Sequence, residues 1–170
     1  MNHKSRVLFF SIGDSTRSQT AEGFLRTFAG DEFVAMSAAT HSLEADPLAR
    51  EVMQEVGIDI SGQHAKDIKE SLTEHFSYVV TVCDASREKF PLWPFPCNIL
   101  HWSVLDPGQA QGTTERKRQV FRHVRDEISR RVREFLENCM GTDPIYTAPV
   151  SASPVEAQAR ESLMSAEMTG

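Results

Sequence analysis

A run of small and polar residues near the N-terminus has the composition of a loop that holds an anion. Its members are Ser11, Ile12, Gly13, Asp14, Ser15, Thr16 and Arg17. Backbone amides at the start of a helix can point toward a bound anion, and the helix dipole adds partial positive charge. The guanidinium of Arg17 can donate two parallel hydrogen bonds to a phosphate-like oxyanion. This pattern predicts an anion-binding loop, and a purely structural turn between a strand and a helix is the alternative.

The segments around this loop predict an α/β fold. Short apolar runs typical of buried strands cover residues 6–10, 33–39, 78–82 and 99–102. Helical periodicity or helix-starting residues occur in segments 18–30, 47–57 and 113–139, and the polar segment 61–72 is expected to hold a short helix. Strands that alternate with helices form a parallel sheet with both faces covered. We therefore predict a small doubly wound fold with about four parallel strands flanked by helices on both faces.

The 170 residues are predicted to form one domain, over residues 1–140, followed by a flexible C-terminal tail over 141–170. The tail is rich in Ala, Ser and Pro. The sequence Ser153-Pro154-Val155-Glu156 within it resembles a capping box with proline at the first helical position. A short helix over 154–166 can therefore form in the tail.

Composition excludes several functional classes. A net charge of −6 argues against general nucleic-acid binding, and no apolar run approaches the ~20 residues of a membrane span. The three cysteines, Cys83, Cys97 and Cys139, are too few for a disulfide framework and form no CxxC motif. They are typical of a reducing compartment, so we predict a cytoplasmic protein. The histidines have no ligand spacing, and we assign no metal and no cofactor.

Motifs further along the chain occur in a recognisable order after the loop and the start of its helix. They are Gly57-Ile58-Asp59-Ile60-Ser61, Val79-Val80-Thr81-Val82-Cys83-Asp84, His101-Trp102, Asp106-Pro107 and Phe121-Arg122-His123-Val124-Arg125-Asp126-Glu127-Ile128. With residues 11–23 they resemble the low-molecular-weight protein tyrosine phosphatase superfamily, most closely its thioredoxin-coupled arsenate reductases. The resemblance covers roughly residues 5 to 137 and implies a four-stranded parallel sheet flanked by helices.

The resemblance also implies roles for individual positions. In that superfamily a cysteine attacks the oxyanion, an arginine and the loop amides hold it, and an aspartate before proline protonates the leaving oxygen. Ser11, Arg17 and Asp106 occupy these positions here. In the reductase branch, further cysteines carry the oxidation to a disulfide that thioredoxin reduces. Their positions are Thr16 in the loop, Cys83 and Phe90.

These replacements predict the loss of thiol chemistry. A serine hydroxyl is far less acidic than a loop cysteine, and the loop has no His or Lys that could act as its base. An oxygen at position 11 cannot enter a disulfide, so Cys83 is an unpaired remnant and thioredoxin coupling is not expected. Asp14 stands where the family usually has Asn. Its charge, at ~6 Å and an effective dielectric near 20, would repel an anion by up to ~3 kcal/mol.

We therefore predict a catalytically degenerate relative that binds phosphate or arsenate, or a phosphorylated protein partner, in the loop from Ser11 to Arg17. Thiol-dependent arsenate reductase or tyrosine phosphatase activity is not expected. One alternative is a weak phosphomonoesterase in which Ser11 or water attacks and Asp106 is the general acid. The other is a regulatory scaffold that binds no anion, with Asp14 and Arg17 forming an internal ion pair.

Overall fold

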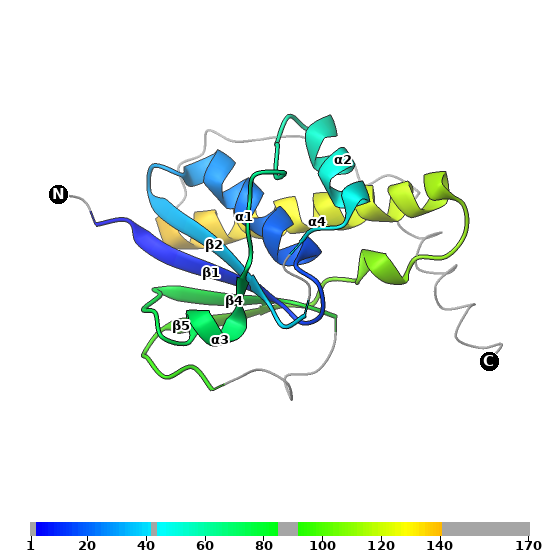
Figure 1. Ribbon diagram of the computed structural model, residues 1–170. Helices are drawn as coiled ribbons and strands as arrows, with labels where there is room; N and C mark the ends of the chain where they lie inside the picture. The colour runs from blue at the N-terminus through cyan, green and yellow to red at the C-terminus, as the bar shows by residue number, and fades with distance from the viewer. Residues whose placement is uncertain (1–2, 42–43, 85–91, 141–170) are drawn as a thin grey trace.

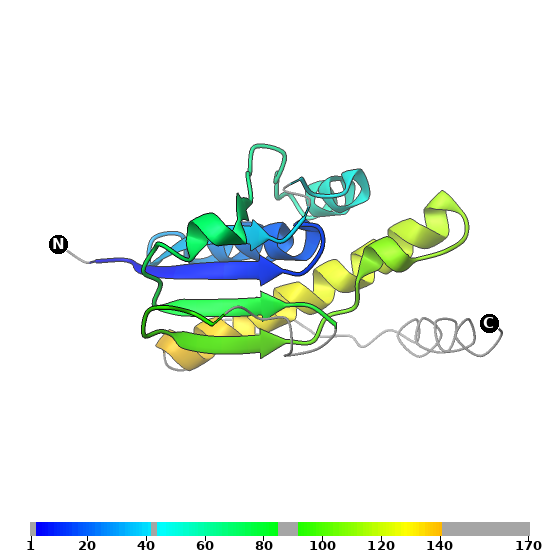
Figure 2. The same cartoon turned by 60° about the horizontal axis from the view of Figure 1, so that its bottom comes forward.

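The computed structural model describes residues 3–41, 44–84 and 92–140, and a parallel sheet lies at its centre (Figure 1). The five strands have the order β3-β2-β1-β4-β5. They are β1 (Ser5–Ser11), β2 (Phe33–Ala39), β3 (Lys66–Asp67), β4 (Tyr78–Val82) and β5 (Asn98–Trp102). The helices are α1 (Thr16–Ala29), α2 (Pro47–Glu55), α3 (Ile68–Ser71), the 3-10 turn η2 (Pro107–Gln109) and α4 (Thr114–Met140). Helices α1 and α4 cover one face and α3 covers the other (Figure 2).

The predicted α/β fold is confirmed, with every strand pairing parallel. The sheet has five strands rather than about four, because the two-residue β3 adds an edge. This strand is charged and lacks an apolar run, and it takes part of the segment where only a short helix was expected. That helix is the single turn α3. The predicted tail over 141–170, with its helix over 154–166, and Phe90 lie outside the described residues.

Strand β1 is the central element that positions the loop. It pairs with β2 on one side and with β4 on the other. Val7 and Phe9 pack under α1 and α4, whereas Leu8 and Phe10 pack on the α3 side, and all four are fully buried. This alternation fixes the strand on both faces. The loop after Ser11 therefore begins from a rigid point at the carboxyl edge of the sheet.

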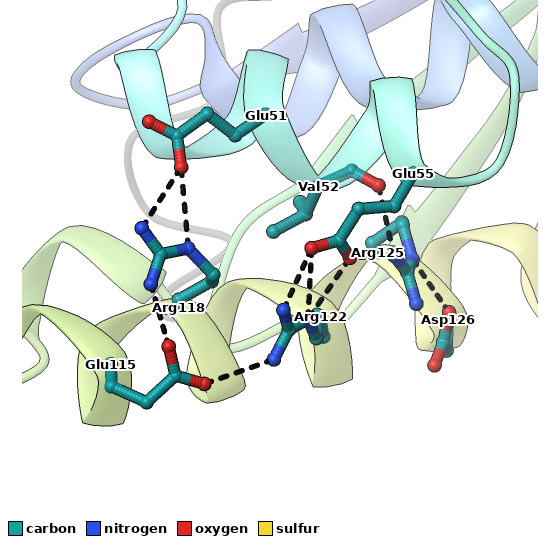
Figure 3. Close-up of polar contacts among 8 residues, drawn as sticks. All are labelled: Glu51, Val52, Glu55, Glu115, Arg118, Arg122, Arg125 and Asp126. Atoms are coloured by element: carbon teal, nitrogen blue, oxygen red, sulfur yellow. Dashed lines mark hydrogen bonds and ion pairs between the residues drawn. The ribbon is translucent and has the colours of Figure 1, made fainter.

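Arginines of α4 bind carboxylates of α2 (Figure 3). The Glu55 carboxylate accepts from Arg122 Nη2 at 2.7 Å and from Arg125 Nη1 at 3.0 Å. A second pair joins Glu51 to Arg118 at 3.2 Å, and Arg125 also donates to a backbone carbonyl of α2 at 2.8 Å. Many of the positive charges on α4 are thus engaged by carboxylates, as expected for a solvated face with ion pairs rather than a nucleic-acid surface.

We expect Glu55→Gln to lower the thermal unfolding midpoint at pH 7 and to have a much smaller effect near pH 2. Hydrogen bonds from Arg122, followed by attraction to Arg122 and Arg125, lower the pKa of Glu55 from 4.5 to about 2. A lowered folded-state pKa gives stabilisation that is complete above the unfolded value and lost as the pH falls through the folded value. The difference between variant and parent should therefore shrink between pH 4.5 and 2.

Glu137→Gln is the matched control for this measurement. Glu137 is exposed on α4 and forms no ion pair within the described residues. Its variant should follow the parent at every pH. A midpoint difference for Glu55→Gln that did not depend on pH would contradict the role assigned to these ion pairs.

Candidate anion-binding site

The loop between β1 and α1 is tied to the segment that follows β2. Gly13 has a φ of +95°, a conformation that glycine adopts without steric cost. Its amide donates to Thr40 Oγ1 at 2.9 Å, and its carbonyl accepts from the His41 amide at 3.0 Å. These two bonds hold the loop backbone in one conformation. The turn is thus stabilised by hydrogen bonds to the segment after β2.

Ser11 lies at the base of this loop and is fully buried. Its Oγ accepts a hydrogen bond from the Ser18 amide at 2.8 Å. An amide of the first turn of α1 therefore points at the side-chain atom of residue 11. Such an arrangement stabilises negative charge on that atom. A hydroxyl gains little from it, since it stays protonated near neutral pH without an adjacent base.

The guanidinium of Arg17 is buried behind the loop, with 3% of the residue exposed. One terminal nitrogen donates to the Val104 carbonyl at 3.0 Å and lies 3.9 Å from Asp84 Oδ1. The other donates to the Ile12 carbonyl at 3.3 Å. The Nε–H is also buried, and no acceptor within the described residues reaches it. Arg17 therefore both crosslinks the loop to the segment after β5 and retains one unsatisfied donor.

Asp14 is bonded to the start of α1. Its Oδ1 accepts from the Thr16 amide at 2.8 Å, an arrangement that satisfies one of the free amides at the helix N-terminus. The ion pair expected under the scaffold alternative, between Asp14 and Arg17, is not formed among the described residues. The acidic partner of Arg17 is Asp84.

Asp106 lies beside the loop, near Asp14. It begins η2, where its Oδ1 accepts from the Gly108 amide at 2.9 Å and its Oδ2 accepts from Gln109 Nε2 at 3.4 Å. A methyl group at Gly108 would lie 3.2 Å from Asp106 Oδ1 and 3.9 Å from Asp14 Oδ2. The two carboxylates thus approach the same point. The structure brings together all the predicted loop residues and the predicted acid.

No disulfide joins the three cysteines, which lie in separate environments. Cys83 is buried at the end of β4, where its amide donates to the Trp102 carbonyl at 3.1 Å. Cys97 packs against the apolar cluster on the α3 side, and burial raises the pKa of its thiol. A disulfide that involves Cys83 is therefore not formed. Trp102 packs on Phe9 with ring centroids 5.6 Å apart and belongs to the hydrophobic core.

Thr40 and Val104 were not identified from the sequence, although both define the site. Val104 contributes through its backbone carbonyl, which leaves no trace in the side-chain pattern. Thr40 follows β2, so strand order alone could have placed it beside the loop. Among the described residues, no three His, Cys, Asp or Glu side chains form a group that could hold a metal ion. No helix in the described ranges is both long and apolar enough to cross a bilayer.

Comparisons with known proteins agree with this geometry. The family model "Low molecular weight phosphotyrosine protein phosphatase" matches residues 6–143. An arsenate reductase of Bacillus subtilis is 40% identical over 131 residues, which cover 77% of this chain and 94% of the relative. One from Halalkalibacterium halodurans is 39% identical over 135 residues, covering 79% and 97%. A solved arsenate reductase in its phosphate binding state is similar with a TM-score of 0.67 and 31% identity, covering 79% and 98%.

Proposed function

The chain belongs to the low molecular weight phosphotyrosine protein phosphatase family, close to the arsenate reductases, and from this premise we propose that it is an oxyanion-binding member without thiol catalysis. The loop from Ser11 to Arg17 would hold phosphate or arsenate, either free or as the phosphoryl group of a protein partner. The protein would act in the cytoplasm and independently of thioredoxin.

The buried Nε–H of Arg17 is the observation that carries this proposal. It has no acceptor within the described residues, although the whole guanidinium is buried. A buried donor without a partner costs about 1–3 kcal/mol. An oxyanion held against the start of α1 would accept this hydrogen bond and would also face the positive end of the helix dipole. The unsatisfied Nε–H of Arg17 therefore favours binding of an oxyanion in the loop.

Loss of thiol catalysis follows from the chemistry at two positions. Residue 11 presents an oxygen, which cannot form the disulfide that arsenate reduction requires. Cys83 forms no disulfide with another described cysteine. A second candidate function, weak phosphomonoester hydrolysis, is favoured by Asp106 beside the loop. It predicts hydrolysis of p-nitrophenyl phosphate that is lost in Asp106→Asn, and phosphate binding without such turnover would exclude it.

Titration calorimetry with phosphate and with arsenate tests the proposal. We expect both to bind the parent protein, and we expect Arg17→Ala to lower the affinity by at least about a hundredfold, since the buried positive charge and its hydrogen bond to the oxyanion are removed. Arg17→Lys keeps the charge without the planar guanidinium, so its affinity should fall between those of the parent and Arg17→Ala.

Folding of these variants needs its own control, because Arg17 also bonds to Val104 and Ile12. A measurement on the parent protein avoids this problem. Its thermal unfolding midpoint should be higher in phosphate than in sodium chloride of equal ionic strength. If the parent shows neither heat of binding nor such a shift, the loop does not bind oxyanions and the proposal is wrong.

A further inference from the structure

The side chain of Thr16 links the loop to a second helix. Thr16 is the first residue of α1 and is buried. Its amide donates to Asp14 Oδ1 at 2.8 Å, and its carbonyl accepts from Thr20 Oγ1 at 2.8 Å. Both bonds stay within the loop and its helix. The Thr16 Oγ1, in contrast, accepts from the Asp46 amide at 2.9 Å, thirty positions along the chain.

Asp46 is the residue that starts α2. Its Oδ1 accepts from the Leu48 amide at 2.8 Å, and its carbonyl accepts from the Ala49 amide at 2.9 Å. Its side chain and carbonyl thus hold the first turn of α2, while its own amide is held by Thr16. The Thr16 hydroxyl therefore attaches the loop to the end of a helix.

Helix α2 is itself held in place by α4. Its buried residues Ala49 and Val52 pack against Phe121 of α4. On the outer side, Glu51 and Glu55 bind arginines of α4 (Figure 3). Since α4 packs on the sheet, the position of α2 is fixed independently of the loop. The Asp46 amide thus gives Thr16 a fixed point of attachment.

We propose that Thr16 is a positioning residue for the oxyanion. Its hydroxyl holds the start of α1 against α2, and this attachment keeps the amides of the loop and the first turn directed at the bound anion. The inference rests on the proposed function. Thr16 acts through the backbone, because its amide is bonded to Asp14 and its hydroxyl to Asp46. Oxyanion binding should in turn strengthen the attachment of α2, since coupling between two sites is reciprocal.

Thr16→Val tests the role of the hydroxyl, because valine has nearly the same shape and cannot accept the hydrogen bond. Calorimetry of the full chain should show phosphate affinity about tenfold lower than in the parent, as expected when a buried amide loses its acceptor. Thr16→Ser restores the hydroxyl and should stay within about twofold of the parent.

Thr20→Val is the matched control. Thr20 is buried to a similar extent one turn along α1, and its hydroxyl donates to the Thr16 carbonyl within the same helix. This variant removes a hydroxyl that does not reach α2, so its phosphate affinity should also stay within about twofold of the parent. A loss as large as that in Thr16→Val would overturn the inference, since any buried hydroxyl of α1 would then have the same effect.

Amide hydrogen exchange of Asp46 provides a readout that does not depend on a variant. In the parent protein, phosphate should slow this exchange by at least about threefold relative to sodium chloride of equal ionic strength. In Thr16→Val, the same amide should exchange at least about tenfold faster than in the parent, while amides of β1 and β4 keep their protection.

The outcomes separate this inference from the proposed function. If Thr16→Val binds phosphate as tightly as the parent does, the inference is wrong and the oxyanion site stands. If the parent binds phosphate but the exchange of its Asp46 amide does not respond, the coupling to α2 is absent and the inference is again overturned. If the parent does not bind phosphate, the proposed function fails and the inference fails with it.

Discussion

Ser11→Cys is expected to give the protein phosphatase activity toward aryl phosphates, at least about a hundredfold above that of the parent, because a thiolate replaces a protonated hydroxyl. The Ser18 amide already points at the side-chain atom of residue 11, and α1 begins beside it. Both features stabilise a thiolate. Arg17, proposed to hold the phosphate, and Asp106, proposed as the acid, are both unchanged in this variant.

Hydrolysis of p-nitrophenyl phosphate measures this gain. Ser11→Ala also places a small side chain at position 11 but provides no nucleophile, so it should be inactive. Adding Asp106→Asn to Ser11→Cys should remove most of the new activity, since no acid would then protonate the leaving oxygen. Thioredoxin-coupled arsenate reduction should stay absent, because position 90 is phenylalanine. An inactive Ser11→Cys protein that binds phosphate normally would contradict this prediction, since a thiol at position 11 would then not be sufficient for catalysis.

Asp14→Asn is expected to raise the affinity for inorganic phosphate and arsenate by about tenfold to a hundredfold, which corresponds to the removal of ~1.4 to ~3 kcal/mol of repulsion. The Asp14 Oδ1 accepts from the Thr16 amide. An asparagine carbonyl can accept the same bond, so the loop should keep its conformation while it loses a negative charge.

The dissociation constants of parent and variant, measured by calorimetry, decide this prediction. Asp59→Asn provides the matched control, because Asp59 Oδ1 accepts from the Ser61 amide at 2.9 Å in a comparable turn far along the sequence. The control changes the net charge equally and should leave both affinities unchanged. Equal affinities for the parent and Asp14→Asn would mean that the Asp14 charge is screened from the anion.

The fold could be predicted because its strands are apolar and its helices are amphipathic. The ranges 33–39 and 78–82 agree with β2 and β4 at both ends. Strand β3 could not be found, since two charged residues carry no pattern and pair only because β2 is already in place. On α4, Phe121 and Phe135 are buried because their large rings reach the interior.

The residues of the candidate site could be predicted where each belongs to a short sequence motif. The loop with Arg17 and the Asp106-Pro107 pair are such motifs, and the structure brings them to one edge of the sheet. The pairing of Arg17 with Asp84, in place of Asp14, could not be predicted. It depends on how the ends of β4 and β5 are placed relative to β1, which is a property of the whole sheet.

The hydrogen bond from Arg17 to the Val104 carbonyl joins residues 87 positions apart. β1 likewise completes its pairing only with β4, from Tyr78 onward. Contacts of such sequence separation form late in folding, because a long loop must close first. During synthesis, the N-terminal loop must therefore wait for most of the domain to leave the ribosome. A nascent or truncated chain that stops before Val104 carries all seven loop residues and lacks this crosslink, so an intact loop also reports that the chain through Val104 has folded.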